Sequence, residues 1–202
     1  MYISAVLIAG GKSRRSPPLM VREEEAARSS VVAAAETLLR TCADEVVVVL
    51  GKRAAEAVSE LPPTPRLRVV ADPDPAEKER ALLRVGIEAA SNEATAYLIH
   101  RTDSTTPPAA TIDRMISHFL RGGRPIAVVV NGVGLDHPIF VSRTLRDELV
   151  EPGEEGWLRG LIARDPTRFL VLRVDARGAV RLIEGPASRS SLPTRRAPEK
   201  AD

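Results

Sequence analysis

Short apolar runs alternate with longer amphipathic stretches along most of the chain. The run from Val46 to Leu50 is apolar at every position, which is typical of a strand buried on both faces of a parallel sheet. Further strands are predicted over Tyr2–Ile8, Arg66–Ala71, Ala94–Ile99 and Pro125–Val130. The stretches between them predict helices over Glu23–Thr41, Ala54–Glu60, Ala76–Ala90 and Thr111–Leu120. This alternation predicts an α/β fold, in which a mostly parallel sheet lies between two helical layers (α/β/α).

The alternation changes after Asn131 and Gly132. Strands are then predicted over Pro138–Ser142, Phe169–Val174 and Ala179–Ile183, with short helices over Arg143–Val150 and Glu155–Arg164. A segment of this kind is expected to fold over the carboxyl edge of the parallel sheet, where ligands bind in such folds. Beyond Gly185, proline, serine, arginine and alanine dominate without periodicity. We therefore expect a single domain over residues 1–185 and a flexible tail over 186–202.

Composition and charge narrow the class of protein. The chain has 202 residues, of which 44% are apolar, enough to bury the core of one domain. A net charge of +2 is too small to indicate nucleic-acid binding, and with 3% aromatic residues few side chains can stack on bases. No apolar run has the length of a membrane span, and the N-terminus does not match a signal peptide. We expect a cytoplasmic protein that binds neither nucleic acid nor membranes.

The first twenty residues hold the strongest candidate for a ligand site. The apolar run is followed by Ala9-Gly10-Gly11 and then by Lys12-Ser13-Arg14-Arg15. Glycine lets the backbone turn and bring its N–H groups close to a ligand, and cations neutralise an anionic one, so this segment predicts a phosphate site. A tight strand-to-helix turn with a solvated basic end is the alternative. The segment is neither a Rossmann fingerprint nor a Walker A loop, because the required glycine spacings are missing.

A second candidate is Asp103, which follows a predicted strand and precedes Pro107-Pro108. A carboxylate just beyond a parallel strand can reach a ligand at the carboxyl edge of the sheet. Hard oxygen donors of this kind suit Mg²⁺. The alternative is that Asp103 caps the following turn or helix with its own side chain.

Taken together, these segments resemble the MobA-like nucleotidyltransferases over roughly residues 1–186. Residues 7–11 are similar to the family's Leu-Ala-Gly-Gly or Leu-Ala-Ala-Gly strand end, and residues 83–86 to its Leu-x-x-Gly helix. Asp103 matches the aspartate of the Gly-Asp-x-Pro motif, and residues 136–140 resemble a Gly-His-Pro-Val-Phe strand. Residues 153–156 resemble the Gly-Asp-x-Gly loop that faces the acceptor, with Glu154 in place of the aspartate.

The resemblance implies a Rossmann-like domain of the nucleotide-diphospho-sugar transferase type. It implies transfer of a nucleoside monophosphate from a nucleoside triphosphate, with GTP favoured over CTP, to a phosphorylated small molecule such as the molybdopterin cofactor. Pyrophosphate would leave, Mg²⁺ would be the cofactor, and the protein would act as a monomer or homodimer.

The resemblance also assigns residues to these roles. It implies that the nucleotide is bound by Leu7, Ala9, Gly10, Gly11, Lys12, Ser13, Arg14 and Asp72. It implies catalytic roles for Arg15 and Asp103, and metal ligation by Asp103 and Glu184. For Glu184 the alternative is an exposed side chain that ends a hairpin.

Five other side chains with chemical potential are expected to be structural. The single cysteine, Cys42, lies near the end of an apolar helical pattern, so we expect a small buried side chain and not a nucleophile. His100 and His118 have no metal-ligating neighbours in the sequence, and His137 is given no catalytic role. Trp157, the only tryptophan, is expected to pack in the core instead of stacking on a ligand.

Three positions depart from the family pattern. Met20 stands where the family has a lysine that stabilises charge on the phosphates, Thr102 replaces the glycine before the aspartate, and Leu182 replaces an aspartate near the end. Loss of one preorganised charge donor costs on the order of 10²- to 10³-fold in rate. A second hypothesis is therefore a nucleotide-binding or partner-binding relative with impaired catalysis. A third is a sugar-phosphate nucleotidyltransferase of the same fold.

Overall fold

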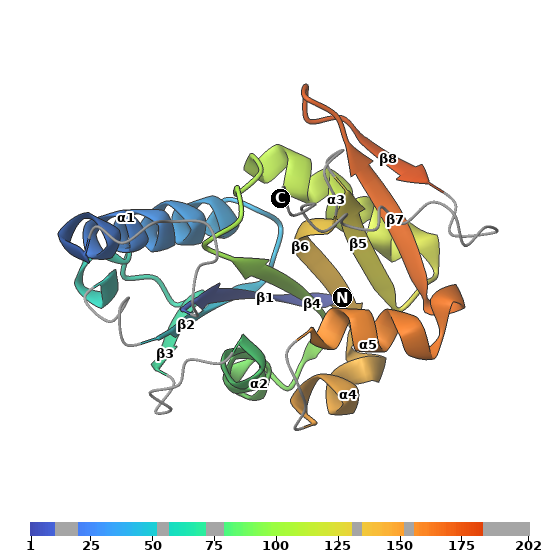
Figure 1. Cartoon of the computed structure of the whole chain (residues 1–202), viewed down its shortest axis with the longest axis horizontal. Coiled ribbons are helices and arrows are strands. Elements are labelled where there is room, and N and C mark those ends of the chain that lie inside the picture. Colours follow the sequence, from blue (N-terminus) through green and yellow to red (C-terminus); the bar gives the residue numbers. More distant parts are fainter. Residues whose placement is uncertain (11–19, 52–56, 72–78, 131–134, 152–155, 184–202) are drawn as a thin grey trace, which may run out of the picture.

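The computed structural model describes residues 1–10, 20–51, 57–71, 79–130, 135–151 and 156–183, with the side chains of 20–29 excepted. In these residues eight strands form one sheet through the middle of the molecule (Figure 1). They are β1 (Tyr2–Ala9), β2 (Glu45–Leu50), β3 (Leu67–Ala71), β4 (Ala94–Arg101), β5 (Ile126–Val130), β6 (Leu135–Ser142), β7 (Phe169–Val174) and β8 (Val180–Ile183). Their order across the sheet is β3-β2-β1-β4-β6-β5-β7-β8.

The sheet is mostly parallel. β3, β2, β1 and β4 pair in parallel, as do β5 and β7. β6 is antiparallel to both of its neighbours, and β8 is an antiparallel edge strand. The parallel half therefore brings the carboxyl ends of β1, β2 and β4 to the same edge of the sheet, next to one another.

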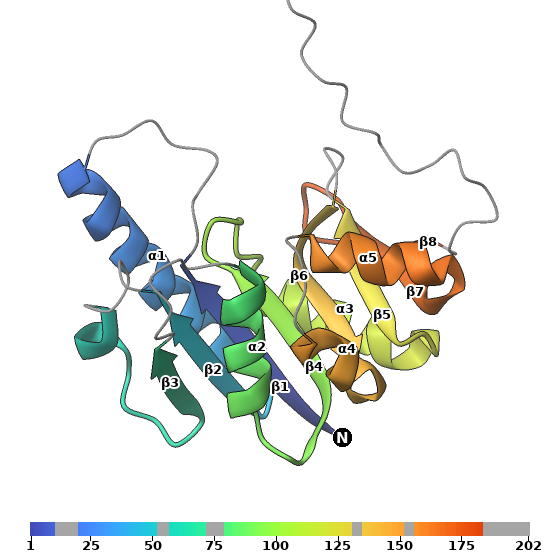
Figure 2. The same cartoon turned by 60° about the horizontal axis from the view of Figure 1, so that its bottom comes forward.

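Helices cover both faces of the sheet (Figure 2). One face is packed by α1 (Met20–Leu39) and α3 (Ala109–Gly122). The other face is packed by α2 (Glu79–Ala89), α4 (Arg146–Val150) and α5 (Trp157–Arg164). These layers confirm the predicted α/β/α fold. None of the helices in the described part of the chain is long and apolar enough to cross a membrane.

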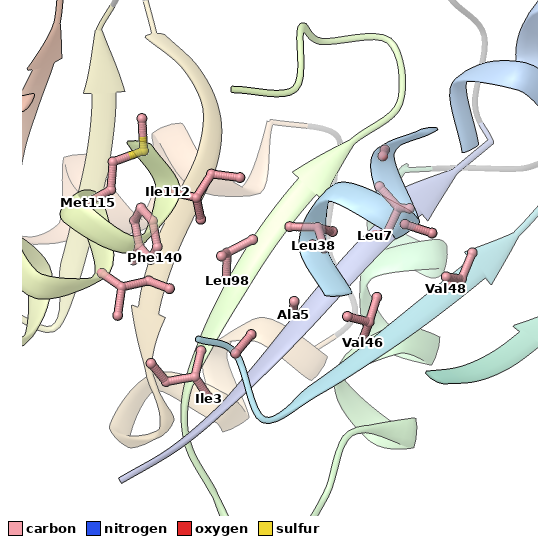
Figure 3. Packing of buried hydrophobic residues seen from close by; sticks show 14 of the residues in the cluster. Ile3, Ala5, Leu7, Leu38, Val46, Val48, Leu98, Ile112, Met115 and Phe140 are labelled. Atoms are coloured by element: carbon pink, nitrogen blue, oxygen red, sulfur yellow. The ribbon is translucent and has the colours of Figure 1, made fainter. Parts of the chain in front are cut away.

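The two faces of each central strand supply two separate cores. In β1, Ala5 and Leu7 face the α1 side, whereas Val6 and Ile8 face the α2 side. Figure 3 shows the first of these clusters, in which Leu7 packs beside Leu38 of α1. Because both faces of such a strand are covered, its sequence is apolar without alternation. This is the physical reason for the continuous runs in the sequence.

Two strands extend by more than one residue beyond their predicted ends. β4 was expected to end at Ile99, but His100 and Arg101 still pair with Leu7 and Ile8 of β1. Arg101 is partly exposed there, whereas His100 is fully buried and a nitrogen of its ring has a partner in the hydroxyl of Thr106. β6 begins at Leu135 instead of Pro138, because its first residues pair with the end of β5. The extension of β4 places Arg101 at the carboxyl edge.

Some other expectations are corrected or only partly covered. Of the helix predicted over 54–60, residues 54–56 lie outside the described part of the chain, and residues 57–60 form a single 3₁₀ turn. The buried position predicted for Cys42 is wrong, because α1 ends at Leu39 and Cys42 lies exposed in the connection to β2. Partial burial and a hydrogen bond with Asp113 nevertheless raise the pKa of its thiol to about 11. The expectation that Cys42 is not a nucleophile agrees with this pKa, because the thiolate is disfavoured.

Candidate functional site at the carboxyl edge of the sheet

The chain leaves β1 at Gly10, in close contact with the end of β2. The backbone N–H of Gly51 donates to the carbonyl oxygen of Ala9 at 2.7 Å. A Cβ atom on Gly10 would lie 3.0 Å from Leu82 Cδ1 and 3.1 Å from the Cα of Gly51. A side chain at position 10 would therefore press on the backbone of Gly51, and glycine allows the end of β1 to lie close against the end of β2.

The end of β4 brings a carboxylate to the same edge. Ile8 of β1 pairs with Arg101, and the N–H of Thr102 donates to the carbonyl oxygen of Ile8 at 3.1 Å. Gly10 and Asp103 each lie two residues beyond that pair, on adjacent strands. The sheet register thus places Gly10 and Asp103 at one edge.

Arg101 binds both oxygens of Asp103. Its Nε lies 2.9 Å from Oδ1 and its Nη2 lies 2.6 Å from Oδ2. The two side chains are partly buried, with 22% and 33% of their surfaces exposed. A guanidinium and a carboxylate joined by two parallel hydrogen bonds form the most directional type of ion pair in proteins. Asp103 therefore already holds a cation.

A second carboxylate binds the same guanidinium from another element. Nη1 of Arg101 donates to Glu79 Oε2, at the first residue of α2. The other oxygen of Glu79, Oε1, accepts a hydrogen bond of 3.2 Å from the indole Nε1 of Trp157 in α5. Burial alone would lower the pKa of Arg101, but Glu79 and Asp103 raise it above its ordinary value. The four side chains form one chain of contacts, which we call the Trp157–Asp103 network: Trp157, Glu79, Arg101 and Asp103.

Two histidines lie beside this network and are held neutral. His137 approaches the carbonyl oxygen of Ile99 through Nδ1 at 3.2 Å, which requires a proton on that nitrogen. His100 is fully buried, and its Nε2 lies 2.9 Å from the hydroxyl of Thr106. Burial and the neighbouring His137 lower the pKa of His100 to about 3, and burial also lowers the pKa of His137. Neither ring carries a positive charge at neutral pH, so among the described side chains of this network the cation is Arg101.

Comparison with known families identifies the class of protein to which this site belongs. The sequence profile described as the MobA-like NTP transferase domain matches residues 5–169. The chain belongs to this family. The matched region runs from β1 to the first residue of β7, and so contains Gly10, Asp103 and the whole network. The resemblance inferred from the motifs is thereby confirmed, and this MobA-like domain belongs to a family of nucleotidyltransferases.

Solved structures share the fold of this MobA-like domain. The manganese complex of Rv0371c from Mycobacterium tuberculosis H37Rv is 23% identical, with a TM-score of 0.63 over 87% of this chain and 89% of that chain. The Rv0371c homolog from Mycobacterium sp. strain JC1 is 25% identical, with a TM-score of 0.66 over 86% of both chains. The 4-diphosphocytidyl-2C-methyl-D-erythritol synthase from Anaerococcus prevotii DSM 20548 is 13% identical, with a TM-score of 0.63 over 89% and 90%. No curated protein matches the sequence.

Only some of the predicted site residues of the MobA-like domain lie in the described part of the chain. Gly10 and Asp103 lie at the carboxyl edge as expected. Leu7 and Ala9 are fully buried. The remaining candidates lie outside the described residues: Gly11, Lys12, Ser13, Arg14, Arg15, Asp72 and Glu184. Glu154 and the tail over 186–202 also lie outside them.

The expectation for Trp157 is confirmed, and two residues of its network were missed. Trp157 is 6% exposed and packs among the residues of α4 and α5. Arg101 was not singled out, although a cation two residues before a carboxylate at a strand end is a readable signal. Glu79 carries no such signal, because its contact with Arg101 depends on the packing of α2 against the sheet.

Proposed function

We propose that this protein transfers GMP from GTP to a phosphorylated small-molecule acceptor such as the molybdopterin cofactor, and releases pyrophosphate. The observation that carries the proposal is the placement of Gly10 and Asp103 at one edge, two residues beyond the pair of Ile8 and Arg101. A glycine, which has no side chain, at the same edge as a carboxylate suits a triphosphate that is bound together with a divalent cation. Membership of the MobA-like family supports this class of reaction.

The carboxylates of this edge fit Mg²⁺. Asp103 and Glu79 each bind the guanidinium of Arg101, so both carboxylates are paired with a positive charge in this structure. Carboxylate oxygens are the hard donors that Mg²⁺ prefers. When bound, the ion would neutralise charge on the phosphate oxygens and orient the triphosphate. The manganese bound by Rv0371c supports a divalent cation in a protein of this fold.

Asp103 is the ligand that we assign, and Glu184 is the second candidate. Within the described ranges, no group of three or more His, Cys, Asp or Glu side chains is placed to hold a metal ion. A cation at Asp103 would therefore take further ligands from the phosphates of the nucleotide, as Mg²⁺ commonly does at nucleotide sites. The site is expected to be completed by its own substrate.

In the proposed transfer, an oxygen of the acceptor phosphate attacks the α-phosphorus of GTP. A new phosphorus–oxygen bond forms as the bond from the α-phosphorus to the bridging oxygen of the β-phosphate breaks, and pyrophosphate leaves with that electron pair. The protein contributes position and charge. Gly10, which has no side chain, would let the phosphates approach the backbone, and Arg15 is proposed to neutralise them.

The preference for GTP over CTP is the most specific part of the proposal. The sequence Ala9-Gly10-Gly11 supports guanine, because the resemblance associates Ala-Gly-Gly with GTP and Ala-Ala-Gly with CTP. The synthase from Anaerococcus prevotii is named for a cytidyl product, so CTP is the nucleotide to compare.

Pyrophosphate release tests the transfer. The full chain is incubated with Mg²⁺ and the molybdopterin cofactor, with GTP in one reaction and CTP in another. Release with GTP alone supports the proposal in full. Release with CTP alone contradicts the guanine preference, and release with neither contradicts the transfer to this acceptor.

A second candidate is a relative that binds nucleotides and does not transfer them. Two observations favour it: Arg101 already binds both oxygens of Asp103, and methionine stands at position 20. Binding of GTP by calorimetry without release of pyrophosphate would decide for this candidate.

A further inference from the structure

The contact between Arg101 and Asp103 has the geometry of a bound cation. Both oxygens of the carboxylate accept hydrogen bonds from the same guanidinium, at 2.9 and 2.6 Å. The pair spans only two residues at the end of β4, so the backbone holds the two side chains close together. Any other cation that approaches these oxygens directly meets a positive charge already in place.

Arg101 is also held from its far side. Its Nη1 donates to Glu79, and Glu79 is itself fixed by the indole of Trp157 at 3.2 Å. Arg101 could therefore leave Asp103 without losing all of its partners, because its contact with Glu79 uses a different nitrogen. The guanidinium has two carboxylate partners, Glu79 and Asp103. Of these, only Asp103 directly follows the parallel strand β4.

We propose that Arg101 is an internal counter-ion of Asp103, which a divalent cation must displace before it can bind. The inference rests on the proposed cation site at Asp103 and adds a competitor to it. Two like charges within a few ångströms of each other repel strongly in a partly buried site. Arg101 and the metal ion are thus alternatives at the same two oxygens, and Arg101 lowers the affinity of the site for the metal ion.

This competition gives the network a regulatory role. In the metal-free protein Arg101 neutralises Asp103, and both Asp103 and Glu79 are paired with the same guanidinium. When a nucleotide arrives with its cation, Arg101 would keep Glu79 and release Asp103. The cation would then bind tightly only together with the phosphates, because their contacts with the cation offset the loss of the contact between Arg101 and Asp103.

Direct metal binding tests the competition without any need for turnover. The probe is Mn²⁺, whose free aquo ion is counted by its paramagnetic resonance signal as the protein is titrated. Arg101→Gln removes the charge and keeps a side chain of similar reach. We expect Mn²⁺ to bind this variant at least tenfold more tightly than the wild-type chain, and Asp103→Asn to lose the binding.

The control variants separate competition from a general change in charge. Arg84→Gln removes a charge from the exposed part of α2, where Arg84 pairs with Glu88, and is expected to leave the Mn²⁺ affinity within twofold. In the Arg101→Gln/Asp103→Asn double variant the tenfold gain must vanish, because the proposed gain acts through Asp103. Arg101→Lys keeps the charge but cannot bind both oxygens at once, and we expect an intermediate gain. This variant also serves as the test if the glutamine variant does not fold.

The outcomes distinguish the inference from the function on which it rests. If Asp103→Asn loses Mn²⁺ binding and neither Arg101 variant binds more tightly, the cation site stands and the competition is wrong. If Asp103→Asn binds Mn²⁺ as the wild-type chain does, both the cation site and the competition are wrong. A gain in the Arg101 variants that persists in the double variant also overturns the competition.

Discussion

The indole nitrogen of Trp157 donates to Glu79 Oε1 at 3.2 Å, across 78 positions of the sequence. This hydrogen bond joins α5 to Glu79, the first residue of α2. Glu79 in turn accepts a hydrogen bond from Arg101 through its other oxygen. The packing of α5 is thereby coupled to the side chain that holds Asp103.

Replacing Trp157 by phenylalanine tests this connection. The variant keeps an aromatic ring in the core but removes the N–H donor, and leaves one oxygen of the partly buried Glu79 with one partner fewer. We expect a loss of about 1–3 kcal/mol in the free energy of unfolding, from the lost hydrogen bond and the reduced packing. Urea unfolding of Trp157→Phe, Glu79→Gln and the double variant would measure the coupling. Strictly additive losses would contradict a direct interaction.

Two glycines in helices on the same face of the sheet give a matched pair for packing. A Cβ atom on Gly86 in α2 would lie 2.4 Å from Val6 Cγ1 and 2.8 Å from Val49 Cγ2. Both valines are fully buried, so Gly86→Ala should destabilise the protein by about 1–3 kcal/mol. Gly160 in α5 has no atom within 4 Å of its Cβ position. Gly160→Ala should stabilise the protein by up to about 1 kcal/mol, because alanine favours the helix.

Thermal or urea unfolding of the two alanine variants would check these signs. Equal effects at both positions would contradict the close approach of α2 to β1 and β2. The comparison is sharp because both substitutions add the same methyl group to a helix.

The buried His100 predicts a dependence of stability on pH. Its pKa is lowered to about 3 in the folded protein, against 6.5 for the ordinary side chain. Between these two values the unfolded chain binds a proton that the folded chain does not, so stability falls as the pH falls. His137, whose pKa is also lowered, acts in the same direction. We expect His100→Gln to reduce the slope between pH 4.5 and 6 by up to about 1.4 kcal/mol per pH unit.

Urea unfolding of the wild-type chain and the variant across this range would measure the difference. Parallel stability curves would show that His100 takes up its proton equally easily in the folded and unfolded chains.

The methionine at position 20 predicts a gain of function. If the site transfers a nucleotide, Met20→Lys adds a cation at the first residue of α1, where the family has a lysine. Pyrophosphate release should rise by about tenfold or more, on the scale of a single charge donor to a transition state. Val21→Lys adds the same charge one position further along the helix, about 100° around its axis, and should not raise the rate. An equal gain in both variants would indicate a general effect of charge.

The sheet and its layers could be predicted from sequence because each central strand carries its own signal. The run Val46–Leu50 is apolar at all positions since both of its faces are buried, and Phe169–Val174 was placed with its correct ends. The carboxyl end of β4 could not be predicted, because His100 and Arg101 are polar but still pair with Leu7 and Ile8 of β1. Apolar periodicity does not report strand pairing, and His100 is a polar residue that is both paired and fully buried.

The site could be predicted only where local sequence carries the chemistry. Gly10 and Asp103 follow strands directly, so a parallel sheet brings them to one edge. Glu79 reaches Arg101 through the docking of α2, and Trp157 reaches Glu79 through the docking of α5. Contacts of this kind depend on tertiary packing between segments that no local pattern relates. Cys42 was misplaced for a similar reason, since α1 ends at Leu39, three residues before Cys42, and leaves Cys42 exposed.

The central claim is that the carboxyl edge at Gly10 and Asp103 binds a nucleoside triphosphate together with a divalent cation. Calorimetric titration of the full chain with GTP and with CTP, each with and without Mg²⁺, tests it most directly. We predict binding below millimolar concentration that requires Mg²⁺, is tighter for GTP, and is lost in Asp103→Asn. If neither nucleotide binds at millimolar concentration, or if Asp103→Asn binds GTP with Mg²⁺ as the wild-type chain does, the claim is wrong.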